Sequence, residues 1–252
     1  MQNFPAEFEA LLYDPASSYD SLLGYAQELK SRGCSQREVY RLFDFYAMRH
    51  RDDADERIYD NLLDVMDLIW GSCSPHKAMW PPLRIELLAD HPEAIPMVAG
   101  WYFHEWGKVV PGNSLEQTVE RLQQRVNRDH LPLHFVAIEE SGVVGVAQLK
   151  RHEMDIYPER EFWLGGLFVA PEARRFNVGR RLADHVAKTA DSIGFDELFL
   201  QTEALDGGFY KWLGWKILET VDYHGVRVAV MRHSLKDPQW HIPSGPWNLI
   251  RN

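Results

Sequence analysis

The junction between an apolar run and a basic segment, in residues 162–182, holds the residue types best suited to chemistry. Residues 162–169 have the composition of a buried strand, and a helical pattern follows from about Asn177. A helix that begins this close to a strand presents unpaired backbone N–H groups and the positive end of its dipole, and both attract an anion. Four arginines surround the turn of this otherwise acidic chain: Arg174, Arg175, Arg180 and Arg181. Guanidinium groups bind phosphate oxygens well, so the junction predicts a pyrophosphate site.

Other catalytic patterns are missing from the sequence. His104-Glu105 lacks the second histidine of His-Glu-x-x-His, so we expect no metal. No Gly-x-Ser-x-Gly segment offers a serine nucleophile, and the basic turn lacks the Lys-Ser/Thr ending of a nucleotide-triphosphate loop. Cys34 and Cys73 form no Cys-x-x-Cys pair, which indicates free thiols rather than a disulfide framework.

The basic turn resembles the acetyl-CoA motif of the GNAT superfamily of acyltransferases, (Gln/Arg)-x-x-Gly-x-(Gly/Ala). Arg174 fills the first position and Gly179 the last. Asn177 stands where the family usually has glycine, and Arg175 where many members have another glycine. Asparagine tolerates a positive φ angle and also caps helices, so it is compatible with such a loop.

A second segment, Gly208-Phe209-Tyr210-Lys211-Trp212-Leu213-Gly214-Trp215, resembles the family's Phe-Tyr-x-x-Leu-Gly-Phe segment. The resemblance extends over residues 83–233 and implies that Tyr210 approaches the sulfur of CoA. A neutral phenol there can give a proton to the departing thiolate, so Tyr210 is the candidate general acid.

The resemblance also implies how acetyl-CoA binds as cosubstrate. In the family, the strand before the phosphate turn separates from its neighbour and holds the pantetheine arm through backbone hydrogen bonds. An amine then attacks the thioester directly in a ternary complex, with no covalent enzyme intermediate. The implied cofactor-binding residues are Leu167, Phe168, Val169, Arg174, Arg175, Asn177, Val178, Gly179 and Arg180.

The acceptor is less well defined than the cofactor. Glu161 precedes the central strand and Glu203 ends the next one, so these two are the candidate general bases, with a solvated surface charge as the alternative for each. By resemblance, Glu105 and Trp106 lie where family members shape the acceptor pocket, although Trp106 is equally compatible with a core position. By the same resemblance, the acidic loop 151–160 borders the acceptor region and would favour a small cationic amine as acceptor, although surface loops are often acidic for solubility alone.

The elements around these residues predict an α/β (α+β) domain over residues 81–235. We expect strands in the apolar runs at 83–88, 133–139, 143–150, 162–169, 197–202, 215–220 and 226–232. We expect helices at 92–106, 114–128, 177–193 and 208–213. Glu140-Ser141-Gly142 is a hairpin signal, and Asn113 is the expected cap of the second helix. This order predicts a mixed, mostly antiparallel sheet flanked by helices.

Residues 1–80 predict a separate small helical domain of unknown role. Helices are expected at 18–32, at 35–46 with a Ser35/Glu38 capping box, and at 54–70, before a proline-rich linker at 71–82. The tail 236–252 is rich in aromatic and apolar residues, and we expect it to cover the domain's own surface or, alternatively, to form a homodimer contact.

Composition limits the partners and the location. The chain has 252 residues and a net charge of −10, which opposes nucleic-acid binding. No apolar run approaches the roughly 18 residues of a membrane helix, and the first residues lack a secretory pattern, so we expect a cytoplasmic protein with no membrane partner.

Two alternatives to catalysis on a small molecule remain open from the sequence. The replacement of glycine by Asn177 is compatible with an acyl-CoA sensor or interaction module that has the fold and no activity. The helical N-terminal region is compatible with recruitment of a protein target for acetylation.

Overall fold

The computed structural model describes residues 4–53, 55–71, 75–107 and 112–236. These residues form two compact units that divide between Pro82 and Leu83. Cys73 and all but the first residue of the 236–252 tail lie outside the described residues, whereas Cys34 is a free thiol. None of the described helices is both long enough and apolar enough to cross a membrane.

The N-terminal unit is helical, with one helix more than the sequence pattern predicts. Its described α-helices are α1 (Phe4–Leu12), α2 (Tyr19–Ser31), α3 (Gln36–His50) and α4 (Arg57–Trp70). Ser18 and Ser35 cap α2 and α3 through reciprocal capping boxes. The unpredicted helix is α1, which buries Phe8 and Leu12 completely in the core of this unit.

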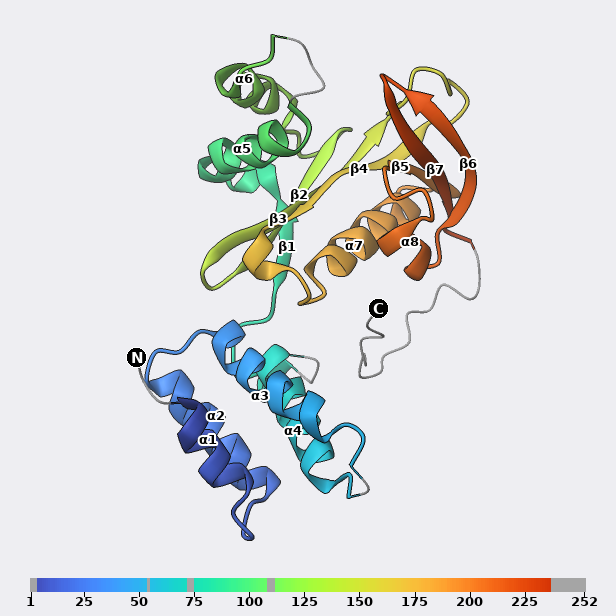
Figure 1. The fold of residues 1–252 in the computed structure, drawn as a ribbon. Helices are drawn as coiled ribbons and strands as arrows, with labels where there is room; N and C mark the ends of the chain where they lie inside the picture. Colours follow the sequence, from blue (N-terminus) through green and yellow to red (C-terminus); the bar gives the residue numbers. More distant parts are fainter. Residues whose placement is uncertain (1–3, 54, 72–74, 108–111, 237–252) are drawn as a thin grey trace. The chain divides into compact units, whose positions relative to one another are not determined.

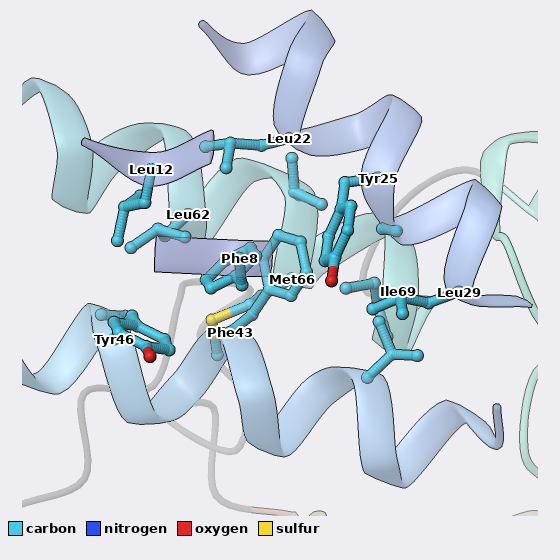
Figure 2. Packing of buried hydrophobic residues seen from close by; sticks show 14 of the residues in the cluster. Phe8, Leu12, Leu22, Tyr25, Leu29, Phe43, Tyr46, Leu62, Met66 and Ile69 are labelled. Carbon is cyan, nitrogen blue, oxygen red and sulfur yellow. The ribbon is translucent and has the colours of Figure 1, made fainter. Parts of the chain in front are cut away.

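Phe8 organises the aromatic part of that core (Figure 2). Its ring centroid lies 4.7 Å from that of Phe43, 5.0 Å from that of Tyr46 and 5.5 Å from that of Tyr25. Tilted pairs of this kind stabilise a fold by about 0.5–1.5 kcal/mol each beyond the area that they bury. The helix α1 is therefore part of the fold of this unit.

The C-terminal unit is built on a mixed sheet (Figure 1). Its strands are β1 (Arg84–Leu87), β2 (Leu133–Glu139), β3 (Gly142–Arg151), β4 (Phe162–Val169), β5 (Glu197–Thr202), β6 (Lys216–Tyr223) and β7 (Val226–Ser234). They lie in the order β1-β2-β3-β4-β5-β7-β6. Each neighbouring pair is antiparallel except β4 and β5, which are parallel. The prediction of a mixed, mostly antiparallel sheet is confirmed.

Helices cover both faces of this sheet (Figure 1). On one face are α5 (Ile95–Trp106) and α6 (Leu115–Arg125), which pack on β2, β3 and β4 through a shared apolar cluster. On the other face is α7 (Val178–Ser192), whose Val178 and Leu182 approach Gly145 of β3. The short helix α8 (Gly208–Trp212) follows β5.

The cap of α6 differs from the one predicted. Ser114, rather than Asn113, is the N-cap residue, and its hydroxyl accepts the N–H of Gln117 at 3.2 Å. The Asn113 side chain instead accepts hydrogen bonds from Thr118 and Arg121. Ser114 takes the N-cap position because Gln117 follows it at the spacing of a capping box and completes the reciprocal hydrogen bond.

Candidate active site

The parallel strands β4 and β5 separate soon after they meet. Among the described residues, Trp163 and Phe199 are the one register pair that they share. Beyond this pair, β4 continues to Val169 and β5 to Thr202 without pairing to each other. The facing edge of β4 therefore presents backbone donors and acceptors, as an edge strand does, and an extended molecule can bind there.

A bulge marks the middle of β4. The pairing of β3 with β4 shifts register between Val146 and Gln148, and Gly166 has φ +53°. A Cβ atom at Gly166 would lie 2.5 Å from Gln148 Nε2 and 3.0 Å from Tyr102 Oη. Glycine is required here by both the backbone angle and the close approach of these two side chains.

The turn after β4 has the geometry of an anion cradle. Arg175 (φ +71°) and Asn177 (φ +57°) both take left-handed backbone angles. The first hydrogen bond of α7 runs from the Arg181 N–H to the Asn177 carbonyl at 2.9 Å. The N–H groups of residues 178–180 thus precede the hydrogen-bond ladder and face outward from the helix end, an arrangement that suits an anion.

Asn177 contributes to the turn through its backbone conformation and not through its side chain. It is the N-cap residue of α7, yet its side chain makes no capping hydrogen bond. Of the two properties that made asparagine compatible with this position, the positive φ angle is used and the side-chain cap is not. The left-handed angle keeps the amide side chain away from the helix N–H groups, because side-chain capping needs an extended residue.

The four arginines of the turn have different environments. Arg174 Nε donates to the Val169 carbonyl at 3.1 Å, and its guanidinium lies 5.7 Å from the centroid of the Phe168 ring. Arg175 is exposed. Arg180 is buried and lies near Asp184, and Arg181 donates to the Leu83 carbonyl at 2.6 Å. Arg175 and Arg174 are consequently the two of this group whose charge is best exposed to a ligand.

Glycine at position 179 lets α8 approach the same turn. A Cβ atom at Gly179 would lie 3.3 Å from Phe209 Cζ and 3.5 Å from Val169 Cγ2. Phe209 is followed by Tyr210, whose ring meets that of Trp215 edge to face. The segments 174–179 and 208–215, which are separated by 28 residues in the sequence, are thus adjacent in space.

Tyr210 has the properties of an acid that is protonated at neutral pH. Burial raises the pKa of its phenol to about 12. Within the described part of the chain, its hydroxyl has no hydrogen-bond partner. A phenol that is neutral and not engaged is available to donate a proton to a bound group.

A buried polar cluster lies on the α5–α6 face, next to the β4 bulge. The Lys150 ammonium of β3 forms an ion pair with Glu153, and Gln201 of β5 donates to Glu153 Oε1 at 3.2 Å. Burial, followed by the charge of Arg125, lowers the pKa of Lys150 to about 8. Glu153 thereby links β3 to β5 beside the position where β4 and β5 part.

A cavity of about 340 Å³ opens on the same face of the sheet. It lies among α5, α6 and the start of β2, and its floor is the end of β3. Its lining residues are Tyr102, Thr118, Arg121, Leu122, Arg125, Leu131, Pro132, His134, Gln148, Lys150 and Arg151. Tyr102, Gln148 and Lys150 belong both to this cavity and to the surroundings of the bulge.

The residues predicted for the acceptor lie around this region rather than in it. Glu105 and Trp106 do not line the cavity; the Trp106 ring packs on that of Tyr102, which does. Glu161 is ion-paired with Arg151 just before β4, at the opposite end of this strand from the arginine-rich turn 174–179. Glu203 is exposed and comes one residue after β5, two residues beyond Gln201.

Sequence reasoning missed Tyr102, Gln148 and Lys150. The signal for Tyr102 was its place one helical turn before Trp106, which puts both on one face of a helix. Gln148 and Lys150 alternate with apolar residues in β3, a pattern that usually marks a solvent-facing side. Only the packing of α5 and α6 onto that side turns it into the wall of a cavity.

The comparisons with known proteins agree with this geometry. A model of the Acetyltransferase (GNAT) family matches residues 80–215. Among solved structures, yncA, a putative acetyltransferase from Salmonella typhimurium with its cofactor acetyl-CoA, is 16% identical; the match spans 62% of this chain and 95% of that one, with a TM-score of 0.50. An N-acetyltransferase from Staphylococcus aureus Mu50 is 15% identical over 61% of this chain and 99% of its own, with a TM-score of 0.48.

An aminoglycoside 6'-acetyltransferase type Ii is 20% identical over 61% of this chain and 98% of its own, with a TM-score of 0.47. At such identities the similarity concerns the fold alone. No curated protein matches the sequence.

Proposed function

Because the chain belongs to the acetyltransferase (GNAT) family, we propose that it transfers the acetyl group of acetyl-CoA to a primary amine by direct attack in a ternary complex. The separation of β4 from β5, which leads directly into the phosphate turn, is the observation that carries the proposal. It offers one continuous track, with backbone groups for a pantetheine arm and helix N–H groups for a pyrophosphate.

The residues of the track suit acetyl-CoA as cosubstrate. Leu167, Phe168 and Val169 supply the backbone edge of β4, and Arg174, Arg175 and Asn177 form the turn with Val178, Gly179 and Arg180. When bound, acetyl-CoA supplies a thioester that an amine can attack. The protein then contributes binding and orientation, which hold the two reactants together.

Tyr210 acts as the general acid in this proposal. Phe209 of α8 lies close to Gly179 of the arginine-rich turn, and this contact supports a position of Tyr210 beside the thiolate leaving group. The raised pKa keeps the phenol protonated at neutral pH, so that it can donate its proton to the sulfur and then regain a proton from solvent.

Of the two carboxylates predicted as bases, we assign Glu203 rather than Glu161. Arg151 holds the Glu161 carboxylate in an ion pair, whereas the Glu203 side chain has no partner among the described residues. An amine arrives protonated, and Glu203 removes that proton through a water molecule before attack.

An acetyl-transfer assay tests the proposed activity. Release of CoA from acetyl-CoA is measured over a panel of amines, together with thermal melting of the protein with and without acetyl-CoA. Binding stabilises the fold by about 3 kcal/mol at a hundredfold excess over the dissociation constant. A melting shift with no release on any amine would favour an acyl-CoA-binding module, and no shift at all would contradict the cofactor assignment.

Two matched variants test the base. Glu203→Gln is expected to lower kcat/KM at least tenfold at pH 7 and less at higher pH, where the amine loses its proton without help. Glu161→Gln removes an equal charge and is expected to change kcat/KM less than threefold. The opposite ranking would move the base to Glu161.

A further inference from the structure

The cavity on the α5–α6 face is strongly basic. Four cationic side chains line it: Arg121, Arg125, Lys150 and Arg151. No carboxylate is among its described lining residues. In a chain with a net charge of −10, such a concentration of positive charge in one small cavity indicates an anionic ligand.

The charges of two of these side chains are already neutralised. Lys150 pairs with Glu153, and Arg151 pairs with Glu161. Among the described residues, Arg121 donates hydrogen bonds to neutral oxygens alone, those of Asn113 and Thr118. Arg125 forms no side-chain hydrogen bond or ion pair within the described part of the chain. The two guanidinium groups of α6, one turn apart on one helix face, thus retain their charge for a ligand.

A neutral polar group in the cavity wall also lacks a partner. His134 Nδ1 is buried and has no hydrogen-bond partner among the described residues, whereas the buried phenol of Tyr102 lies beside Gln148. Burial, then the charges of Lys150 and Arg125, lower the pKa of His134 to about 4, so the imidazole is neutral at physiological pH. Buried polar atoms without partners are rare in proteins, and a ligand that supplies the missing bond accounts for this one.

The cavity borders the place where acetyl transfer would occur. Its residues Tyr102 and Gln148 contact the bulge at Gly166, and Lys150 contacts Gly165. These glycines lie on the stretch of β4 that has just separated from β5. A small molecule seated in the cavity can therefore extend one end toward the β4 edge.

We propose that this cavity binds the carboxylate of the acceptor, so that the acceptor is an amine that also bears a carboxylate, as an amino acid does. Arg125 and Arg121 hold the carboxylate, and the amine points toward the bulge of β4. This inference rests on the proposed function, since it names the substrate class of the same site.

The acidic loop 151–160 predicts a cationic acceptor, whereas the basic cavity predicts an acceptor that also bears a negative carboxylate. The carboxylates of that loop are already engaged, Glu153 by Lys150 and Glu159 by Arg160. Asp155 interacts with Tyr223. Charges that are paired within the protein attract a cationic acceptor weakly, so the loop's composition is a poor guide to the ligand.

The experiment compares amines that differ only in the carboxylate. For each L-amino acid and its amide, kcat/KM is measured with acetyl-CoA at saturation. We expect kcat/KM for the best amino acid to exceed kcat/KM for its amide at least tenfold. Arg125→Gln is expected to raise KM for the amino acid at least tenfold while leaving the amide within twofold, and Arg125→Lys is expected to recover part of the loss. An amide as good as its acid would overturn the inference and leave the proposed function intact.

Arg128→Gln is the matched control. Arg128 follows α6 but does not line the cavity, and it pairs with Asp90 on the surface. If Arg128→Gln also loses the preference for an amino acid over its amide, the preference depends on overall charge, and the cavity is not the carboxylate site.

Calorimetry separates failure of this inference from failure of the proposed function. Amino acids are titrated into the protein saturated with CoA, so that no turnover is needed. Binding that Arg125→Gln abolishes would support the cavity even if no amine is acetylated. No binding by any amino acid, together with acetylation of amines that lack a carboxylate, would refute it.

Discussion

Gln201 of β5 donates a hydrogen bond to Glu153 at 3.2 Å, and Glu153 in turn holds the ammonium of Lys150 on β3. This bridge connects strands on either side of β4, at the level where β4 and β5 part. The side chain of Glu153 is only 17% exposed and that of Lys150 26%, so their pairing occurs largely out of water. Breaking such a pair leaves an uncompensated buried charge.

Glu153→Ala is therefore expected to destabilise the protein by about 1–2 kcal/mol at pH 7, because the Lys150 ammonium loses its counter-charge and, with a pKa of about 8, escapes the penalty only by losing its proton. The double variant Lys150→Met/Glu153→Leu removes both charges and is expected to recover most of that loss. Urea denaturation of the single and double variants measures both effects. Equal destabilisation in the two would mean that the carboxylate acts mainly through Gln201 rather than through Lys150.

The sheet and the position of the arginine-rich turn before α7 were predictable because their signals are local. Apolar runs between turn residues predict the strands, and an arginine-rich turn before the helix that begins at Val178 predicts an anion site, which stays a prediction. The helix α1 was missed, although Phe8 and Leu12 stand at helical spacing. The polar cluster was missed because it depends on strands distant in sequence: Gln201 reaches Glu153 only after β5 has joined the sheet beside β4.

The backbone angle of Asn177 leads to a second prediction. Asn177→Gly is expected to leave the dissociation constant of acetyl-CoA within about threefold and the stability within about 1 kcal/mol, because the side chain makes no capping bond. Asn177→Val places a β-branched residue at φ +57° and is expected to cost about 1–2 kcal/mol. Calorimetric titration and urea denaturation provide the two measurements. A tenfold weaker binding in the glycine variant would show instead that the amide contacts the cofactor.

His134 is expected to make the fold sensitive to acid. Its pKa in the folded protein is about 4, against about 6.5 in an unfolded chain, because burial and the nearby charges of Lys150 and Arg125 disfavour its cation. Between these values the unfolded chain binds a proton that the folded chain does not. The stabilisation is complete above pH 6.5 and is lost as the pH falls to about 4, with a total of about 3 kcal/mol.

The pH dependence of His134 is isolated by a variant that cannot titrate. The free energy of unfolding is measured at pH 7.5 and pH 5 for the natural protein and for His134→Gln. The natural protein should lose more stability over this interval than the variant does, since carboxylates titrate in both. An equal loss in the two would show that His134 keeps an ordinary pKa in the folded state.

The last prediction concerns Tyr210, whose hydroxyl is the one group that Tyr210→Phe removes. The ring keeps its edge-to-face contacts with Phe209 and Trp215, so the dissociation constant of acetyl-CoA should change less than about twofold. A general acid contributes about 10²–10⁴-fold to the rate of its step, and kcat should fall accordingly. Because the pKa of the phenol is about 12, loss of its proton should not limit activity below about pH 10.

Single-turnover rates are the appropriate measurement for Tyr210→Phe, since slow product release would hide an effect on the chemical step. Tyr13→Phe, which alters an exposed phenol of the N-terminal unit, serves as the control. A fall of less than about threefold for Tyr210→Phe with the best acceptor would refute the acid role and leave Tyr210 as a packing residue between Phe209 and Trp215.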